Sequence, residues 1–162
     1  MADKDNMEQV VVPFPKKGTL KESERKWGKT VMEQGFCIVP SLLFRAQQRL
    51  GLNATQLAII MHLADFWWEQ ERKPYPSKAT IGERLGLSSR QVQRHIAELE
   101  KAELLQRIER KGFYGKQSNY YDLSGLVNRL QQLAPEFREV KDETKRMKRA
   151  VARRGFRRKK EA

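Results

Sequence analysis

One face of a predicted helix over residues 89–102 carries side chains suited to reading DNA bases. These side chains are short or form hydrogen bonds, and their spacing places them on one side of a helix: Arg90, Gln93, Arg94 and Ala97. An arginine fork can form two hydrogen bonds to guanine O6 and N7 or neutralise a phosphate, and a glutamine can read adenine. Ser88, Ser89 and the first helical N–H groups suit a phosphate. The chemistry indicated is binding to the major groove of double-stranded DNA.

Residues 77–102 supply the helix-turn-helix that would hold this face in position. Ser77 is a good N-cap for a short first helix, on which Ile81 and Leu85 fall four residues apart. Gly82 is small where a second helix must cross closely, and Gly86 stands where a left-handed residue would end the first helix. Ser88 or Ser89 can cap the second helix. The buried stripe of that helix is predicted at Val92, Ile96 and Leu99, opposite the candidate binding face.

A β-hairpin is predicted directly after the second helix. Residues 103–110 and 118–123 are the two strands, and residues 111–117 form a turn with two glycines. A hairpin in this place is a wing, here over residues 104–123, which would lie along the DNA backbone or in the minor groove. Its candidate contacts are the cations Arg107, Arg110, Lys111 and Lys116. Helix-turn-helix units also serve as packing modules or protein-binding surfaces, but these cations and Arg90 and Arg94 favour nucleic acid.

The positive charge of the chain is concentrated in its last part. The formal net charge of the 162 residues is +13, and residues 138–160 hold twelve basic and three acidic residues. Such a stretch suits a phosphate backbone, whose neutralisation releases counterions. The candidate phosphate contacts at its end are Arg153, Arg154, Arg157 and Arg158.

Two helices are predicted after the wing. The first runs from Ser124 to about Leu133, and Pro135 begins the second, which ends before Gly155. In the second helix apolar or short residues recur in an a/d pattern at Phe137, Val140, Thr144, Met147 and Val151. This stripe either packs on the body of the protein or forms a homodimer seam through residues 135–151, and the sequence leaves both readings open.

The sequence before the helix-turn-helix predicts a polar arm and two helices. Residues 1–30 form a largely disordered arm in this reading, and residues 36–39 are a short extended piece. Ser41 caps a helix closed by Gly51, and Asn53 or Thr55 opens the next, whose apolar face includes Leu57, Ile60, Met61, Ala64 and Trp68. Residues 69–76 are a loop. The predicted division is an N-terminal arm (1–35), a winged helix-turn-helix domain (36–133) and a basic C-terminal helix and tail (134–162).

Catalysis, metal binding and a membrane location are not indicated. Cys37 is the single cysteine, which points to the cytosol, and its apolar neighbours predict a buried thiol. One cysteine and two isolated histidines, His62 and His95, provide no zinc ligand set. Gly28-Lys29-Thr30 lacks the earlier glycine and the preceding strand of a phosphate-binding loop. We therefore expect a non-enzymatic, cytoplasmic, nucleoid-associated protein without a cofactor, and nothing indicates a small-molecule effector.

Residues 36–133 resemble the winged-helix proteins of the bacterial helix-turn-helix superfamily, found in transcription regulators and in phage and plasmid regulation or replication modules. The resemblance is carried by four short stretches, 75–77, 81–88, 92–94 and 99–105. In that group the last stretch commonly reads Leu-Glu-x-x-Gly-Leu-Ile, and Glu103 and Leu105 stand here in place of the glycine and the isoleucine. The resemblance implies a mainly α fold with a small β-hairpin, and DNA binding.

These observations predict a sequence-specific double-stranded-DNA-binding protein, with helix 89–102 in the major groove. A transcriptional regulator of a bacterium or a mobile element is the leading reading. One alternative is a plasmid or phage replication-initiation or replisome-organising protein. The other is a basic nucleic-acid-binding protein of low specificity.

Overall fold

The structure, a computed structural model, describes residues 19–112 and 115–153 and divides the chain into two units, residues 1–37 and 38–162. The first unit contains α1 (Thr19–Trp27) and α2 (Lys29–Met32), which are separated by Gly28 at φ 85°. These helices correct the prediction of a disordered arm for its described part. Residues 19–32 are rich in good helix formers, and the prediction gave too much weight to their polarity.

The second unit begins with two helices that form one side of its core. The first, α3 (Ser41–Arg45), is shorter than predicted, because residues 46–51 form turns that end at Gly51 with φ 67°. The second, α4 (Ala54–Asp65), starts at a capping box in which Asn53 and Gln56 each accept a hydrogen bond from the other's backbone N–H.

The buried face of α4 differs from the predicted one. It is made by Gln56, Ile59, Ile60 and Leu63, whereas Met61 is 39% exposed and Trp68, beyond the end of the helix, is 69% exposed. The run of apolar residues from Leu57 to Trp68 is longer than one helix face needs, so its spacing alone did not identify the side that is covered.

The helix-turn-helix consists of α5 (Lys78–Leu85) and α6 (Ser89–Lys101), as the sequence predicted. The wing follows. Its base is an antiparallel pair of β1 (Gln106–Ile108) and β4 (Tyr120–Asp122), with Arg107 opposite Tyr121. A second short pair, β2 (Lys111–Gly112) and β3 (Gly115–Lys116), forms within the segment that was predicted as a turn.

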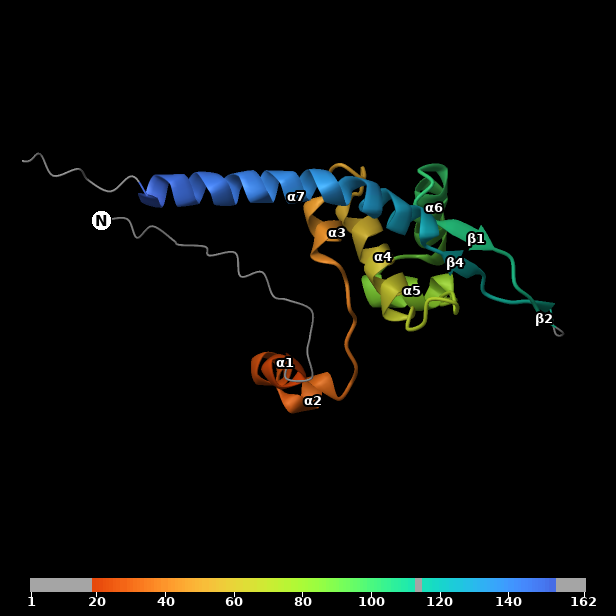
Figure 1. Cartoon of the computed structure of the whole chain (residues 1–162). Helices are drawn as coiled ribbons and strands as arrows, with labels where there is room; N and C mark the ends of the chain where they lie inside the picture. Colours follow the sequence, from red (N-terminus) through yellow and green to blue (C-terminus); the bar gives the residue numbers. More distant parts are fainter. Residues whose placement is uncertain (1–18, 113–114, 154–162) are drawn as a thin grey trace, which may run out of the picture. The chain divides into compact units, whose positions relative to one another are not determined.

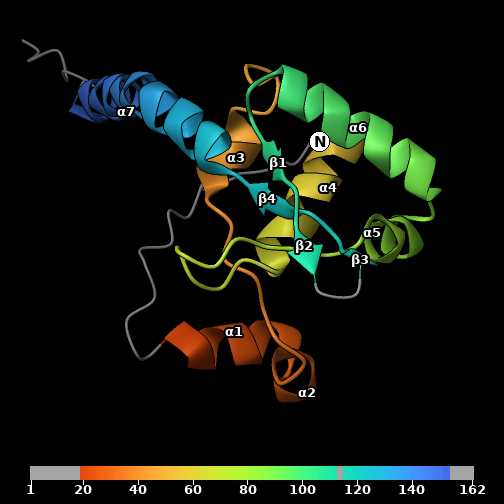
Figure 2. The same ribbon diagram turned by 90° about the vertical axis from the view of Figure 1, so that its right-hand side faces the viewer.

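The core of the second unit lies between α3, α4, α5, α6, the base of the wing and the start of α7 (Figures 1 and 2). Its fully buried side chains include Ile59, Ile81, Val92, Ile96 and Tyr121. The backbone of Pro74 joins the wing, because the Tyr121 N–H donates to the Pro74 carbonyl at 2.8 Å. The result is a winged helix-turn-helix, in agreement with the fold class predicted from the sequence.

After the wing the chain continues as a single helix, α7 (Ser124–Arg153), of 30 residues (Figure 1). Two helices separated before Pro135 were predicted, and this prediction was wrong. Pro135 lies within α7, where it removes one backbone hydrogen bond, and its exposed position leaves the freed carbonyl of Gln131 accessible to water.

Cys37 is exposed, which corrects the expectation of a buried thiol: the irregular segment 34–40 places it outside the core. Among the described residues, none of the helices combines the length and apolar character required to cross a bilayer.

Candidate nucleic-acid interface

The turn between α5 and α6 fixes the direction in which α6 leaves the core. Gly86 takes a left-handed conformation at φ 66°, and the Leu87 N–H donates to the Gly82 carbonyl at 2.8 Å. A Cβ atom on Gly82 would lie 2.4 Å from the Leu87 carbonyl oxygen. The close approach of the turn to α5 therefore requires glycine at position 82, and the two helices are held in one arrangement.

The start of α6 is closed by a capping box. Ser88 Oγ accepts from the Gln91 N–H at 3.2 Å, and Gln91 Oε1 accepts from the Ser88 N–H at 2.9 Å. The sequence predicted the cap at Ser88 or Ser89, and Ser88 provides it. The role of Gln91 was missed, although its position three residues after the cap is the usual signal for this motif.

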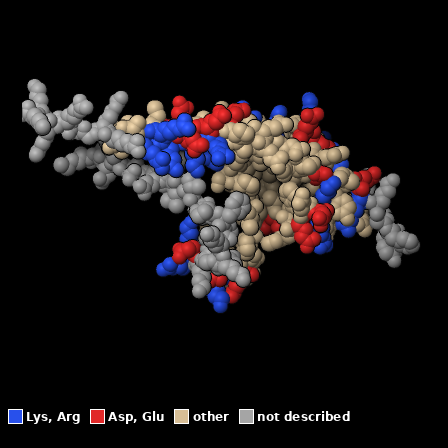
Figure 3. All heavy atoms as spheres, viewed as in Figure 1, with Lys and Arg blue, Asp and Glu red and all other residues tan. Residues whose placement is uncertain are grey.

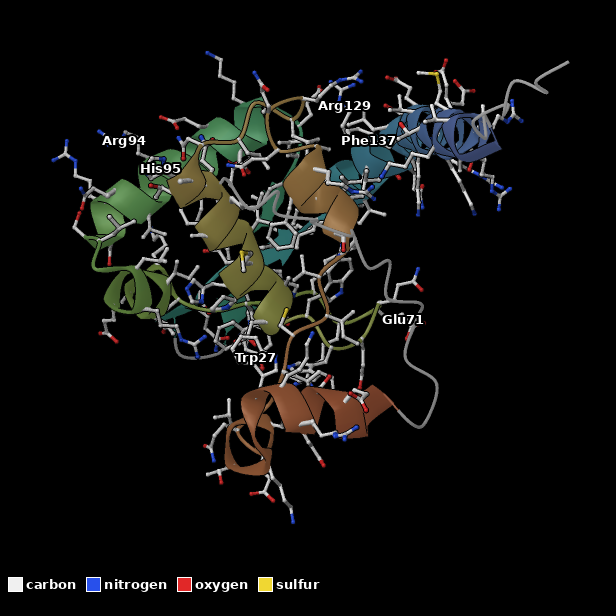
Figure 4. The ribbon with its side chains drawn as sticks, turned by 90° about the vertical axis from the view of Figure 1, so that its left-hand side faces the viewer. Trp27, Glu71, Arg94, His95, Arg129 and Phe137 are labelled. Atoms are coloured by element: carbon white, nitrogen blue, oxygen red, sulfur yellow. The ribbon has the colours of Figure 1, made fainter. Side chains whose placement is uncertain are left out.

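The two sides of α6 differ as predicted. Val92, Ile96 and Leu99 are buried in the core, whereas the predicted binding residues are exposed on the opposite side: Arg90, Gln93, Arg94 and Ala97. These four residues, with Ser88 and Gln91, line a shallow hollow with a volume of about 420 Å³. Figure 4 shows Arg94 on the outer side of α6, directed away from the core. The structure thus brings together Ser88, Arg90, Gln93, Arg94 and Ala97 on one open surface, while Ser89 is exposed at the first turn.

Lys78 is a neighbour of this surface that the sequence reading missed. It is the first residue of α5, and its Nζ donates to Gln93 Oε1 at 2.7 Å. An amide oxygen has two lone pairs, so Gln93 can hold Lys78 and still accept from a base while its NH₂ group donates. The packing of α5 across α6 creates this contact between residues 15 positions apart, and no local sequence pattern predicts it.

The first of the wing cations, Arg107, is engaged inside the domain. Its Nε donates to Glu100 Oε2 at 2.7 Å, and its backbone N–H donates to Glu100 Oε1 at 2.8 Å. The hydrogen bond from the Arg107 side chain is the main cause that lowers the pKa of Glu100. This pair connects the end of α6 to β1. The guanidinium of Arg107 therefore has a carboxylate partner within the domain.

Arg110 packs on aromatic rings. Its guanidinium lies 4.5 Å from the ring centre of Tyr75 and 5.3 Å from that of Tyr120, and the two rings meet edge to face. Such stacking is worth about 0.5–1 kcal/mol at an exposed site. Together with the hydrogen bond from Ser118 Oγ to the Tyr75 carbonyl, at 2.9 Å, it ties the wing to the loop before α5.

The remaining predicted cations are located only in part. Lys111 and Lys116 are register partners in the β2–β3 pair, and their side chains lie outside the part of the chain that the structure describes. Arg153 is the last residue of α7, and Arg154, Arg157 and Arg158 lie outside the described residues. All of them stay predictions.

The bend from α6 into the wing is made without the glycine of the related proteins. Glu103 takes the left-handed conformation itself, at φ 58°. A left-handed residue with a side chain costs roughly 1–2 kcal/mol, so the surroundings must favour this conformation. They do so through two backbone hydrogen bonds that close the end of α6, from the Glu103 N–H to the Glu100 carbonyl and from the Leu104 N–H to the Leu99 carbonyl, both at 3.0 Å.

Within residues 19–112 and 115–153 no group of three or more His, Cys, Asp or Glu residues is arranged to hold a metal ion.

Comparison with known proteins supports the fold. Residues 50–105 match a protein family described as a helix-turn-helix domain. The N-terminal domain of the DnaD protein from Geobacillus kaustophilus HTA426 is similar in structure, with a TM-score of 0.52 and 20% sequence identity over 75% of this chain and 96% of that domain. A possible transcriptional regulator from Methanosarcina mazei Go1 gives a TM-score of 0.40 and 19% identity over 67% of this chain and 84% of its own. No curated protein matches the chain.

Proposed function

Since the chain carries a helix-turn-helix domain within a winged-helix fold, we propose that it binds double-stranded DNA with sequence preference and acts as a transcriptional regulator. One observation carries the proposal. The exposed side of α6 presents Arg90, Gln93 and Arg94 around an open hollow, directly opposite a stripe that is fully buried. Such a helix packs on the core with one side and presents hydrogen-bonding groups on the other. A helix of this kind fits the major groove of DNA.

The exposed side chains have distinct roles in this proposal. Arg90 and Arg94 lie one helical turn apart and each pairs with guanine or with a phosphate. Gln93 reads adenine, and Lys78 holds its amide oxygen in place. Ala97 is small, so the middle of α6 can approach the base edges closely.

Contacts to phosphate position the domain on the duplex. The start of α6, with Ser88 and Ser89, directs its first N–H groups at one phosphate. Lys111 and Lys116 of the wing are proposed to contact the neighbouring backbone or minor groove. Arg107 and Arg110 are left out of the interface, because their guanidinium groups are engaged with Glu100 and with two tyrosines.

A second copy of this chain is the other proposed partner. A dimer presents two copies of α6 to one duplex, an arrangement that matches an inverted repeat. A role in replication initiation is the alternative to regulation: the similarity to a DnaD domain is limited to the fold, and the same DNA-binding surface would then mark an origin.

Footprinting on the DNA that surrounds its own gene tests the proposal. A protected site whose affinity exceeds that of random duplex is expected. Arg90→Ala and Arg94→Ala are each expected to reduce specific affinity by about 1–3 kcal/mol, with the melting temperature unchanged. Arg129→Ala is the matched control, because Arg129 is exposed on α7, outside the hollow (Figure 4). Wild-type preference for the site in both α6 variants would exclude the proposed reading surface.

A further inference from the structure

Apolar and short side chains follow one side of α7 along most of its length. They recur at alternating intervals of four and three residues, which keeps them on one side of a helix. They are Leu126, Leu130, Leu133, Phe137, Val140, Thr144, Met147 and Val151. In the first part of the helix the stripe belongs to the core: Leu126 and Leu133 are buried, and Leu130 and Phe137 pack against the core.

The same stripe is uncovered after Phe137. Val140 is 64% exposed, Met147 66% and Val151 70%. Thr144 lies between them, and its hydroxyl donates to the Val140 carbonyl at 2.8 Å. Because this hydroxyl already has its partner within the helix, the Thr144 methyl group completes the apolar side.

Charged side chains of opposite sign flank the exposed stripe. If Phe137, Thr144 and Val151 occupy a positions and Val140 and Met147 occupy d positions, the e positions hold Lys141 and Lys148 and the g positions hold Glu136 and Glu143. Over the second half of α7, Figure 3 shows Lys and Arg gathered on one side and Asp and Glu on another. Of these four flanking residues, only Glu136 has an ion-pair partner among residues 19–112 and 115–153, namely Arg49.

We propose that a second copy of this chain covers the exposed stripe, and that the two copies of residues 140–151 form a short parallel coiled coil. In a parallel pair each g residue faces the e residue five positions later in the partner helix, which places Glu143 opposite Lys148. Glu136 keeps Arg49 of its own chain as its partner. An antiparallel pair would place g against g and e against e, and so glutamate against glutamate and lysine against lysine. The charges therefore select the parallel orientation.

The parallel orientation also has a consequence for DNA binding, and this consequence rests on the proposed function. The second half of α7 extends away from the winged-helix domain (Figure 1). A parallel seam places both domains at the same end of the coiled coil, where both copies of α6 can reach one duplex. Antiparallel helices would place the two domains at opposite ends.

The first experiment measures association of the full-length chain without DNA, so that its outcome is independent of the proposed DNA binding. Sedimentation equilibrium of the wild type is expected to show a monomer–dimer equilibrium. Glu143→Lys and Lys148→Glu are each expected to weaken the dimer about tenfold, because each creates two like-charge contacts. The double variant restores both attractive contacts and the wild-type affinity. Asp142→Lys is the control, since position 142 faces outward in this register.

Two results of this experiment would overturn the proposal. A wild type that stays monomeric would leave the stripe without the proposed partner. Equal association of the wild type, both single variants and the double variant would exclude the parallel pairing, because that pairing requires weaker association of each single variant and recovery in the double variant.

The second experiment tests the orientation by cross-linking. Val151→Cys is introduced into a Cys37→Ser chain, and both positions are exposed, so the fold is expected to be retained. Residue 151 meets its own copy in a parallel seam, so mild oxidation is expected to yield a covalent dimer at concentrations near the dissociation constant. The matched chain with Arg149→Cys, at an outward position, is expected to cross-link far less. Equal yields from the two chains would contradict the proposed register.

Discussion

The two halves of α7 have the same apolar spacing and opposite surroundings. In the first half, Leu126 is 4% exposed and Leu133 8%, because both side chains belong to the hydrophobic core. In the second half, Val140, Met147 and Val151 are at least 64% exposed. The boundary is Phe137, which packs on the core and lies 5.9 Å from the Arg45 guanidinium. Spacing thus identifies the side of a helix that can be buried, and the neighbouring chain decides whether it is.

The halves also differ in charge. Arg129 is the one charged residue between Ser124 and Pro135, whereas charged residues are frequent from Glu136 to Arg153. A helix that packs within its own domain gains most from apolar side chains. A helix that meets a second copy must also select its partner and orientation, which flanking charges achieve. The difference in composition therefore fits the difference in surroundings.

The largest expected effect contrasts one substitution in each half. Leu126→Ala removes a core side chain and is expected to lower the free energy of unfolding by about 2–5 kcal/mol. Met147→Ala is expected to change it by no more than about 0.5 kcal/mol in dilute solution, where the chain is monomeric. Urea unfolding at low protein concentration measures both. Similar losses in the two variants would show that the second half is covered by its own domain.

A smaller effect is expected at the junction of the halves. Pro135→Ala restores a donor to the Gln131 carbonyl and removes the clash of the proline ring, so the free energy of unfolding is expected to rise by about 1–3 kcal/mol. Thermal unfolding followed by circular dichroism measures the change. A decrease in stability would mean that the two halves need the proline geometry to fit the core.

The next effect on stability concerns the ion pair of Glu100 and Arg107. This pair lies within the domain, unlike the charges that flank the stripe in the second half of α7. Because Arg107 lowers the pKa of Glu100, the pair stabilises the folded state above the ordinary glutamate pKa, and this contribution is lost as the pH falls through the lowered pKa. Glu100→Gln is expected to lower the free energy of unfolding by about 1 kcal/mol at pH 7, and the difference should vanish in acid. Glu83→Gln, an exposed position on α5, is the control. A difference that does not depend on pH would contradict this role.

The smallest effect on stability is expected from removal of residues 153–162, nearly all of which lie outside the described residues. Their few apolar atoms should leave the free energy of unfolding unchanged. Affinity for every duplex is expected to fall, and the salt dependence should decrease by up to about 0.9 in log–log slope for each lost phosphate contact. The preference for a specific site over random DNA should rise. Binding isotherms at several salt concentrations measure these changes, and an unchanged slope would show that the tail does not contact DNA.

Local patterns determined much of the winged helix-turn-helix in advance. The Ser77 cap, the left-handed Gly86 and the stripe of Val92, Ile96 and Leu99 were all predicted, because caps, turns and amphipathic faces depend on residues within one or two helical turns. The exposed side of α6 followed from the same stripe. The candidate binding residues on α6 could therefore be named from the sequence alone.

Other features could be read only from the folded chain, namely which side chains contact one another and where the last helix runs. It paired Arg107 with Glu100, joined Lys78 to Gln93 and continued α7 through Pro135. It also covered the first half of the α7 stripe and left the second half open. Each of these outcomes depends on which segments meet across the core, and neither the type nor the spacing of neighbouring residues contains that information.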